Sequence, residues 1–175
     1  MVRFSTHLEC AKERVMPRLE RLSEVQRQVL LSFPCLEHDT TPWTSLRKEL
    51  SRSKLALVTT AGLHLRGDKP FISDPKGGDA SYRIIPSTAR AADILQSHVS
   101  IGFDHTAIYR DVNITFPIDR VRESVERGLI GSLSQNYYSF MGALRNPRRM
   151  VDETGPDVAR LLKVEGVDVV IITPT

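Results

Sequence analysis

Imidazole and carboxylate side chains gather in one short stretch of this chain, "SHVSIGFDHTAIYRDVN" at residues 97–113. His98, Asp104 and His105 lie within it, and such side chains together can bind a divalent metal or act as a general acid–base pair. Their spacing matches no standard zinc pattern such as H-E-x-x-H. A hydrogen-bonded polar network at strand ends is the more common role of such residues, so both interpretations stay open.

A further histidine follows the first apolar run of the chain. The run "KLALVTTAG", residues 54–62, is typical of a buried strand in an α/β sheet, and His64 comes just after it. Open α/β sheets bind their ligands at the carboxyl ends of the strands. We therefore expect a pocket to which His64, His98 and Asp104 contribute.

The segment "LHLRGDKPFISDPKGGDAS", residues 63–81, is rich in Gly, Asp and Pro and is expected to be a long loop. Its glycines could let backbone N–H groups approach an anion, but neither a Walker A pattern nor G-x-G-x-x-G is present. The remaining interpretations are a surface loop whose Asp and Gly residues make turns, and a loop that covers a substrate.

The spacing of apolar residues predicts the helices and strands that would position these residues. Apolar residues at spacings of three and four predict helices, and short apolar runs bounded by Gly or Pro predict strands. The predicted helices are 6–31 with a break at Pro17, 118–131 and 155–166, and the predicted strands are 54–61, 82–86, 94–100, 112–116, 131–138 and 167–173. This order predicts a three-layer, mostly parallel, Rossmann-like α/β domain over residues 41–175, after an N-terminal helical extension over residues 1–40.

Composition narrows the possible functions. Of 175 residues, 41% are hydrophobic and 26% charged, as in a globular protein with a real core. Lys and Arg number 24 against 21 Asp and Glu, an excess too small to indicate a nucleic-acid partner. The sequence has no membrane-spanning run and no apolar leader, so no membrane partner and a cytoplasmic location are expected. Cys10 and Cys35 lack a C-x-x-C partner, and the chain has no convincing nucleophile.

Several motifs in order resemble the selenoprotein B family of glycine, sarcosine, betaine and D-proline reductases. They are "VTTAGLH" at 58–64, "GDASYRIIP" at 78–86, "IDR…GLIG" within 118–131, and the final "TPT". The resemblance covers about residues 41–175, and the N-terminal helix adds little to it.

The resemblance implies a selenocysteine-dependent reductase that cleaves a C–N bond of an amino acid or amine-like substrate. In that family selenocysteine directly follows a strand that ends in a "TP"-like segment, so we expect the nucleophile at position 176. The domain over 41–175 would then be incomplete at its C-terminal end and inactive by itself. No cofactor besides selenocysteine is implied, and the implied partners are a small-molecule substrate, a thiol or thioredoxin-like reductant and other reductase subunits.

Candidate pocket residues follow from the motifs and from the polar stretch. They are His64, Asp79, Tyr82, His98, Asp104, Asn113, Thr173 and Thr175. The alternatives are a non-catalytic α/β module that binds a small molecule, and a metal site at His98, Asp104 and His105. The apolar strand 167–173 is expected to be uncovered on one face, which predicts a homo-dimer.

Overall fold

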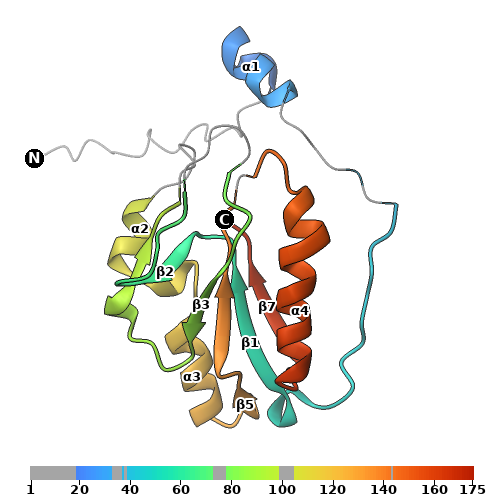
Figure 1. Ribbon diagram of the computed structural model, residues 1–175, viewed down its shortest axis with the longest axis vertical. Coiled ribbons are helices and arrows are strands. Elements are labelled where there is room, and N and C mark those ends of the chain that lie inside the picture. The colour runs from blue at the N-terminus through green and yellow to red at the C-terminus, as the bar shows by residue number, and fades with distance from the viewer. Residues whose placement is uncertain (1–18, 33–36, 38, 73–77, 99–104, 143) are drawn as a thin grey trace, which may run out of the picture. The chain divides into compact units, whose positions relative to one another are not determined.

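The computed structural model describes residues 19–32, 37, 39–72, 78–98, 105–142 and 144–175 (Figure 1). The chain divides into two compact units, Met1–Thr40 and Thr41–Thr175. In the first unit a 3-10 turn at Leu19–Arg21 precedes helix α1, Glu24–Leu31. Ser23 and Gln26 form a capping box that starts α1. The expected helix over 6–31 is thus confirmed over Glu24–Leu31, whereas residues 19–23 form the 3-10 turn and the N-cap, and residues 6–18 lie outside the described part.

A mostly parallel sheet forms the centre of the second unit, as the sequence predicted. Strand β1 pairs in parallel with β5 and β6 along one edge and with β7 along the other, and β3 pairs antiparallel with β6. The strands are β1 (Lys54–Thr59), β3 (Arg83–Pro86), β5 (Ser132–Leu133), β6 (Asn136–Ser139) and β7 (Val169–Thr173). The chain is therefore a mixed α/β protein, and its three-layer, Rossmann-like arrangement stays a prediction.

Strand β1 lies at the middle of the core. Leu55, Ala56 and Leu57 point alternately to the two faces of the sheet, and all three are buried. A strand that is buried on both faces reads as a continuous apolar run, which is why "KLALV" was recognisable in the sequence.

A second, two-stranded sheet corrects the expectation for residues 63–81. Its strands β2 (Leu63–Leu65) and β4 (Ile94–Gln96) pair antiparallel, so the expected loop begins as a strand. The Leu63 N–H also donates to Ser139 Oγ at 2.7 Å, which fixes β2 beside the end of β6. Residues 73–77 of the expected loop and 99–100 of the expected strand 94–100 lie outside the described residues.

Helices connect these strands, and two of them lie within the ranges predicted from the sequence, 118–131 and 155–166. Helices α3 (Ile118–Glu126) and α4 (Gly155–Val164) are each followed by a glycine with positive φ, Gly128 at 69° and Gly166 at 75°. The shorter elements are 3-10 turns at Leu50–Arg52, Ala91–Asp93 and Val112–Ile114, helix α2 (His105–Arg110), and a π-helical turn at Met150–Thr154. Within the described part of the chain, no helix is long and apolar enough to cross a membrane.

The predicted strand over 112–116 is wrong. The Asp111 carboxylate accepts a hydrogen bond from the Asn113 backbone N–H at 2.9 Å, and the chain turns into a 3-10 helix at Val112–Ile114. This local bond from side chain to backbone competes with strand pairing. The apolar residues Val112 and Phe116 still reach the core, so burial alone did not distinguish the two structures.

Candidate functional site

The carboxyl ends of three parallel strands meet at one edge of the sheet. Backbone pairing continues beyond the strands: the Thr60 N–H donates to the Thr173 carbonyl at 3.2 Å, and the Gly142 N–H donates to the Thr60 carbonyl at 2.7 Å. Thr60 therefore lies between the segments that follow β6 and β7. We call Thr60, His98, Gly142 and Thr175 the strand-tip cluster.

Thr60 fixes the backbone of Thr175 through its side chain. The Thr60 hydroxyl accepts from the Thr175 N–H at 2.8 Å and lies 3.3 Å from the Thr175 carbonyl oxygen, to which it can donate. The Oγ1 of Thr175 is buried without a hydrogen-bond partner among the described residues. A buried hydroxyl of this kind can take a hydrogen bond from a polar group that enters the site.

His98 is held tightly between two glycines. A Cβ at Gly62 would lie 3.0 Å from the His98 backbone nitrogen, and one at Gly142 would lie 3.0 Å from His98 Nε2. His98 as a whole is only 6% exposed. Burial, and then the nearby His105, lower the pKa of His98, whereas a hydrogen bond with the Thr175 backbone opposes this shift. A neutral imidazole therefore stands beside the end of the chain segment that follows β7.

His105 is the second imidazole of the site. The rings of His98 and His105 are 6.4 Å apart between centroids, and His105 Nδ1 lies 2.8 Å from Gln96 Oε1. Gln96 in turn donates from Nε2 to the Ala61 carbonyl at 3.0 Å. Asp104, the third member of the expected metal site, lies outside the described residues. Among the residues that are described, no group of three or more His, Cys, Asp or Glu side chains could hold a metal ion.

A cavity of about 340 Å³ is lined in part by Gln96, the residue that contacts His105. Its walls come from β4, the 3-10 turn before it, α2 and the turn after α2. They include Ala91, Ala92, Ile94, Leu95, Gln96, Ile108, Tyr109, Arg110, Asp111, Val112, Asn113 and Asp119. Asn113 Nδ2 donates to the Asp111 and Asp119 carboxylates at 2.8 and 2.9 Å, and its Oδ1 accepts from the Asp119 N–H at 2.9 Å. This candidate pocket residue therefore belongs to the cavity wall and is bound to the first turn of α3.

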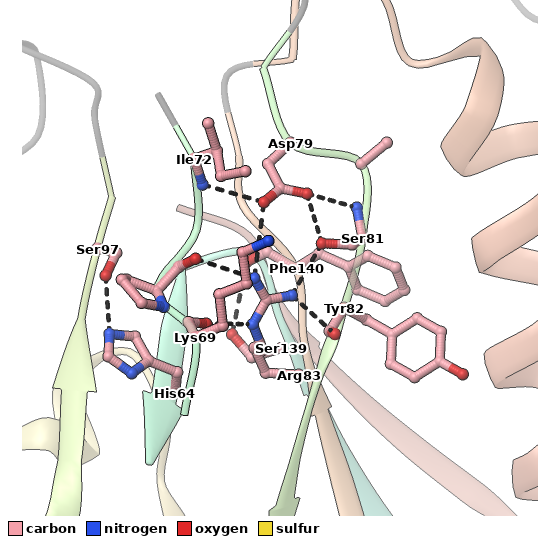
Figure 2. A network of polar contacts seen from close by, with 12 residues as sticks. His64, Lys69, Ile72, Asp79, Ser81, Tyr82, Arg83, Ser97, Ser139 and Phe140 are labelled. Carbon is pink, nitrogen blue, oxygen red and sulfur yellow. Dashed lines mark hydrogen bonds and ion pairs between the residues drawn. The ribbon is translucent and has the colours of Figure 1, made fainter. Parts of the chain in front are cut away.

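Asp79, another candidate, lies in a separate polar network (Figure 2). Its carboxylate accepts from the N–H groups of Ile72 and Ser81 at 3.0 and 2.9 Å and lies 3.6 Å from Arg83. Arg83 also donates to the Lys69 carbonyl at 2.7 Å. Burial alone would raise the pKa of Asp79, but the hydrogen bonds from Ser81 and Ile72 and the Arg83 charge lower it overall. The network ties residues 69–72 to the start of β3.

His64 and Tyr82 also make contacts that hold the fold. His64 Nε2 lies 2.7 Å from Ser97 Oγ, and its Nδ1 lies 2.9 Å from the Leu65 carbonyl oxygen. The Tyr82 hydroxyl donates to Asp157 at 2.6 Å, and this bond, together with burial, raises the pKa of Tyr82 to about 12. His64 thus supports the residue before His98, and Tyr82 links the segment before β3 to helix α4.

The structure brings three predicted residues together, His98, Thr173 and Thr175, at the ends of β1, β6 and β7. His64 is one contact removed from them, through Ser97, while Asp79, Tyr82 and Asn113 have their polar groups bound elsewhere. Sequence reasoning missed Thr60 and Gly142. The sequence did contain a pattern that could have indicated them. Thr60 follows a strand in "VTTAG", and Gly142 follows a strand in "FMG".

The chain is a mixed α/β protein with polar groups at the carboxyl ends of its parallel strands, the edge at which open α/β sheets in general bind their ligands. The chain belongs to the glycine/sarcosine/betaine reductase selenoprotein B family, whose model matches residues 6–175. The resemblance found in the motifs is thereby confirmed. The match also includes most of the N-terminal region, which was expected to add little.

Curated relatives are named as subunits of reductases. The chain is 41% identical over 131 residues to D-proline reductase subunit gamma of Acetoanaerobium sticklandii, covering 75% of this chain and 52% of that subunit. It is 29% identical to glycine reductase complex component B subunit gamma of Carboxydothermus hydrogenoformans, covering 82% and 33%. It is 27% identical to betaine reductase complex component B subunit beta of Peptoclostridium acidaminophilum, covering 94% and 37%. The chain thus spans about half or less of each of these relatives, and no solved structure matches it.

Replacing Gly142 by alanine is expected to open the strand-tip cluster. The added Cβ would collide with the Thr175 carbonyl oxygen and crowd His98 Nε2, both held by other contacts. We expect G142A to speed hydrogen exchange at Thr60 and Thr175 by about tenfold or more, as a local opening does. G67A is the control, because nothing lies within 4 Å of a Cβ at Gly67, where only its φ of 99° causes strain. Unchanged exchange in G142A would contradict the close contact.

Stability should depend on pH through His98. Its pKa is lowered in the folded state, so the unfolded chain binds more protons as the pH falls through about 6.5 and folding loses stability there. The H98Q variant cannot take up this proton. We therefore expect a smaller loss of unfolding free energy between pH 7.5 and pH 5.5 in H98Q than in the unmodified protein, measured by urea denaturation. Equal losses in both proteins would show that His98 does not titrate differently on unfolding.

Loss of the Asp79 carboxylate should release residues 69–72. The side chains of Arg83 and Asp79 are only 14% and 11% exposed, so D79A leaves a nearly buried guanidinium without its ion pair. We expect D79A to destabilise the fold by about 3 kcal/mol. The control D93A removes the partner of Arg90 in a pair exposed by 81% and 48%, and should change stability by less than about 1 kcal/mol. Chemical denaturation of both variants provides the comparison, and similar losses would contradict a special role for Asp79.

Proposed function

We propose that this chain forms part of the catalytic subunit of a selenocysteine-dependent reductase that cleaves a C–N bond of an amino acid or amine-like substrate. The observation that carries the proposal is the strand-tip cluster, in which Thr60 and His98 both bind the backbone of Thr175 at the carboxyl edge of a parallel sheet. Membership of the selenoprotein B family supports the class of chemistry.

In the proposed site a selenocysteine directly follows Thr175. A selenol is more acidic than a thiol, so it is ionised at neutral pH and is a strong nucleophile. An Se–C bond forms as the C–N bond breaks, and the nitrogen leaves with the bonding pair and takes up a proton. A thiol then forms an Se–S bond, and the reduced carbon leaves with a proton.

The residues of this chain would orient the nucleophile. The Thr60 hydroxyl holds the Thr175 peptide at both its N–H and its carbonyl, which limits the directions that the next residue can take. Close positioning of reacting groups is a large part of many rate enhancements. The partners in this proposal are a thiol or thioredoxin-like reductant in the cytoplasm and other reductase subunits, since the relatives are named as subunits of reductases or of reductase complexes.

A second candidate is a module that binds a small molecule without turnover. The cavity of about 340 Å³ beside Gln96 favours it, because it has apolar walls and converging polar groups. This candidate predicts that glycine, betaine or D-proline raises the Tm of the 175-residue chain, with no product formed when a dithiol is present.

The nucleotides after codon 175 test the reductase proposal directly. We expect a UGA codon read in frame, with a downstream selenocysteine insertion hairpin. Expression in a host that inserts selenocysteine should then give a protein whose peptide spectrum shows the selenium isotope pattern directly after Thr175. With a dithiol reductant and the other subunits of a relative's reductase present, this protein should consume glycine, sarcosine, betaine or D-proline, and a variant with serine at the selenium position should not. A second stop codon directly after the UGA, or a codon for a residue without selenium or sulfur, would refute the proposal.

A further inference from the structure

Strand β7 is paired along one edge only. Its residues pair with β1 from Leu55↔Val169 to Thr59↔Thr173, and no other described strand pairs with β7. Figure 1 shows β7 beside β1, on the side away from β3. The backbone N–H and C=O groups on the outer edge of β7 therefore have no strand partner in the described part of the chain. Such an edge is a template for another strand.

The side chains of β7 are those of a central strand. Val170, Ile171 and Ile172 are 37%, 36% and 64% exposed. Because neighbouring side chains point to opposite faces, apolar surface is open on both sides of the sheet. Strands that are apolar on both faces normally lie inside parallel sheets.

The strand at the other edge of the sheet, β3, has features that protect it against further strand pairing. Strand β3 carries Arg83 at one end and Pro86 at the other, and a charged residue and a proline both discourage further pairing. Strand β7 has neither within Val169–Thr173. The charge just before it, Asp168, is bound by Lys48 at 2.7 Å and by the Lys54 N–H at 2.8 Å.

Apolar surface continues from β7 onto the segment before β1. A hollow of about 410 Å³ is lined by Trp43, Leu46, Leu50, Val169 and Val170, among others. Trp43 is 87% exposed. A large aromatic side chain that borders an open apolar hollow is typical of a surface that another element covers.

We propose that the outer edge of β7 receives a further parallel β-strand and that a following helix covers Val170, Ile172 and the hollow beside Trp43. The occupant is the part of the reductase subunit that the relatives possess beyond the matched region. The match covers 52% of D-proline reductase subunit gamma, so roughly half of that subunit is left to supply such elements. The strand is parallel because β1, β5, β6 and β7 all run in one direction. The inference rests on family membership and not on the selenocysteine.

A second copy of this chain fits the surface less well. Two copies of β7 could pair antiparallel about a two-fold axis, which would satisfy the backbone edges. The side chains of Val170 and Ile172 would then still face solvent, because no helix would lie over them. A strand with its helix covers both the edge and the face.

Hydrogen exchange on two proteins tests the proposal. The first is the 175-residue chain, and the second is a chimera in which this chain replaces the matched 131 residues of the Acetoanaerobium subunit. The chimera carries serine at any selenocysteine position, so failure of the reductase proposal would not affect the outcome. We expect the amides of Val169–Thr173 that face the outer edge of β7 to exchange about tenfold or more slowly in the chimera, with the amides of Leu55–Leu57 protected equally in both.

A charge on the strand gives the second measurement. I172K should lower the Tm of the chimera by about 5 °C, because it buries a lysine under the new helix, and should leave the Tm of the 175-residue chain almost unchanged. V164K is the matched control, since Val164 is an apolar residue 79% exposed on α4 and should tolerate lysine in both proteins. Three results would overturn the proposal: equal exchange of β7 in both proteins, equal effects of I172K on both, or a concentration-dependent dimer of the 175-residue chain that alone protects β7.

Discussion

The whole site depends on the pairing of β1 with strands on both of its edges. Because β1 is hydrogen-bonded to β5 and β6 on one side and to β7 on the other, the segments after these strands emerge side by side. Thr60 extends this pairing by one residue and receives Gly142 on one side and Thr175 on the other. The core residues Leu55 and Leu57 hold the strand in place, so the geometry of the tip follows from burial at the centre of the sheet.

A histidine placed at such a tip has unusual properties because of what surrounds it. Gly142 leaves space for the imidazole and Gly62 for the His98 backbone, because neither glycine has a Cβ that would crowd these atoms. The same enclosure disfavours the charged form, which lowers the pKa of His98 and favours the neutral ring near neutral pH. Packing at two glycines thus determines the chemistry available at a third residue.

Sequence reasoning was most successful where an element leaves a local pattern in the sequence. The apolar runs of β1 and β7 and the glycines after α3 and α4 were recognisable because each depends on neighbours within a few residues. It failed at Val112–Ile114, where the Asp111 side chain decided the backbone shape, and at β2, whose partner lies some thirty residues away on β4. The convergence of Thr60, Gly142 and Thr175 depends on strand order, which no local pattern contains. A glycine or threonine just after a buried strand was nevertheless a usable signal.

The exposed strand β7 is also part of the candidate site. The same strand β7 carries Thr175 at its tip and Ile172 on its exposed face, with Thr173 paired to Thr59 between them. An element added along the outer edge of β7 would therefore run toward the strand-tip cluster, since parallel strands end at the same edge of a sheet. It would also bury Thr175 further and exclude water from His98. Completing the sheet and enclosing the site would then be a single structural event, and the relatives, of which the chain covers 52% or less in each of the three compared, have the additional length to accomplish it.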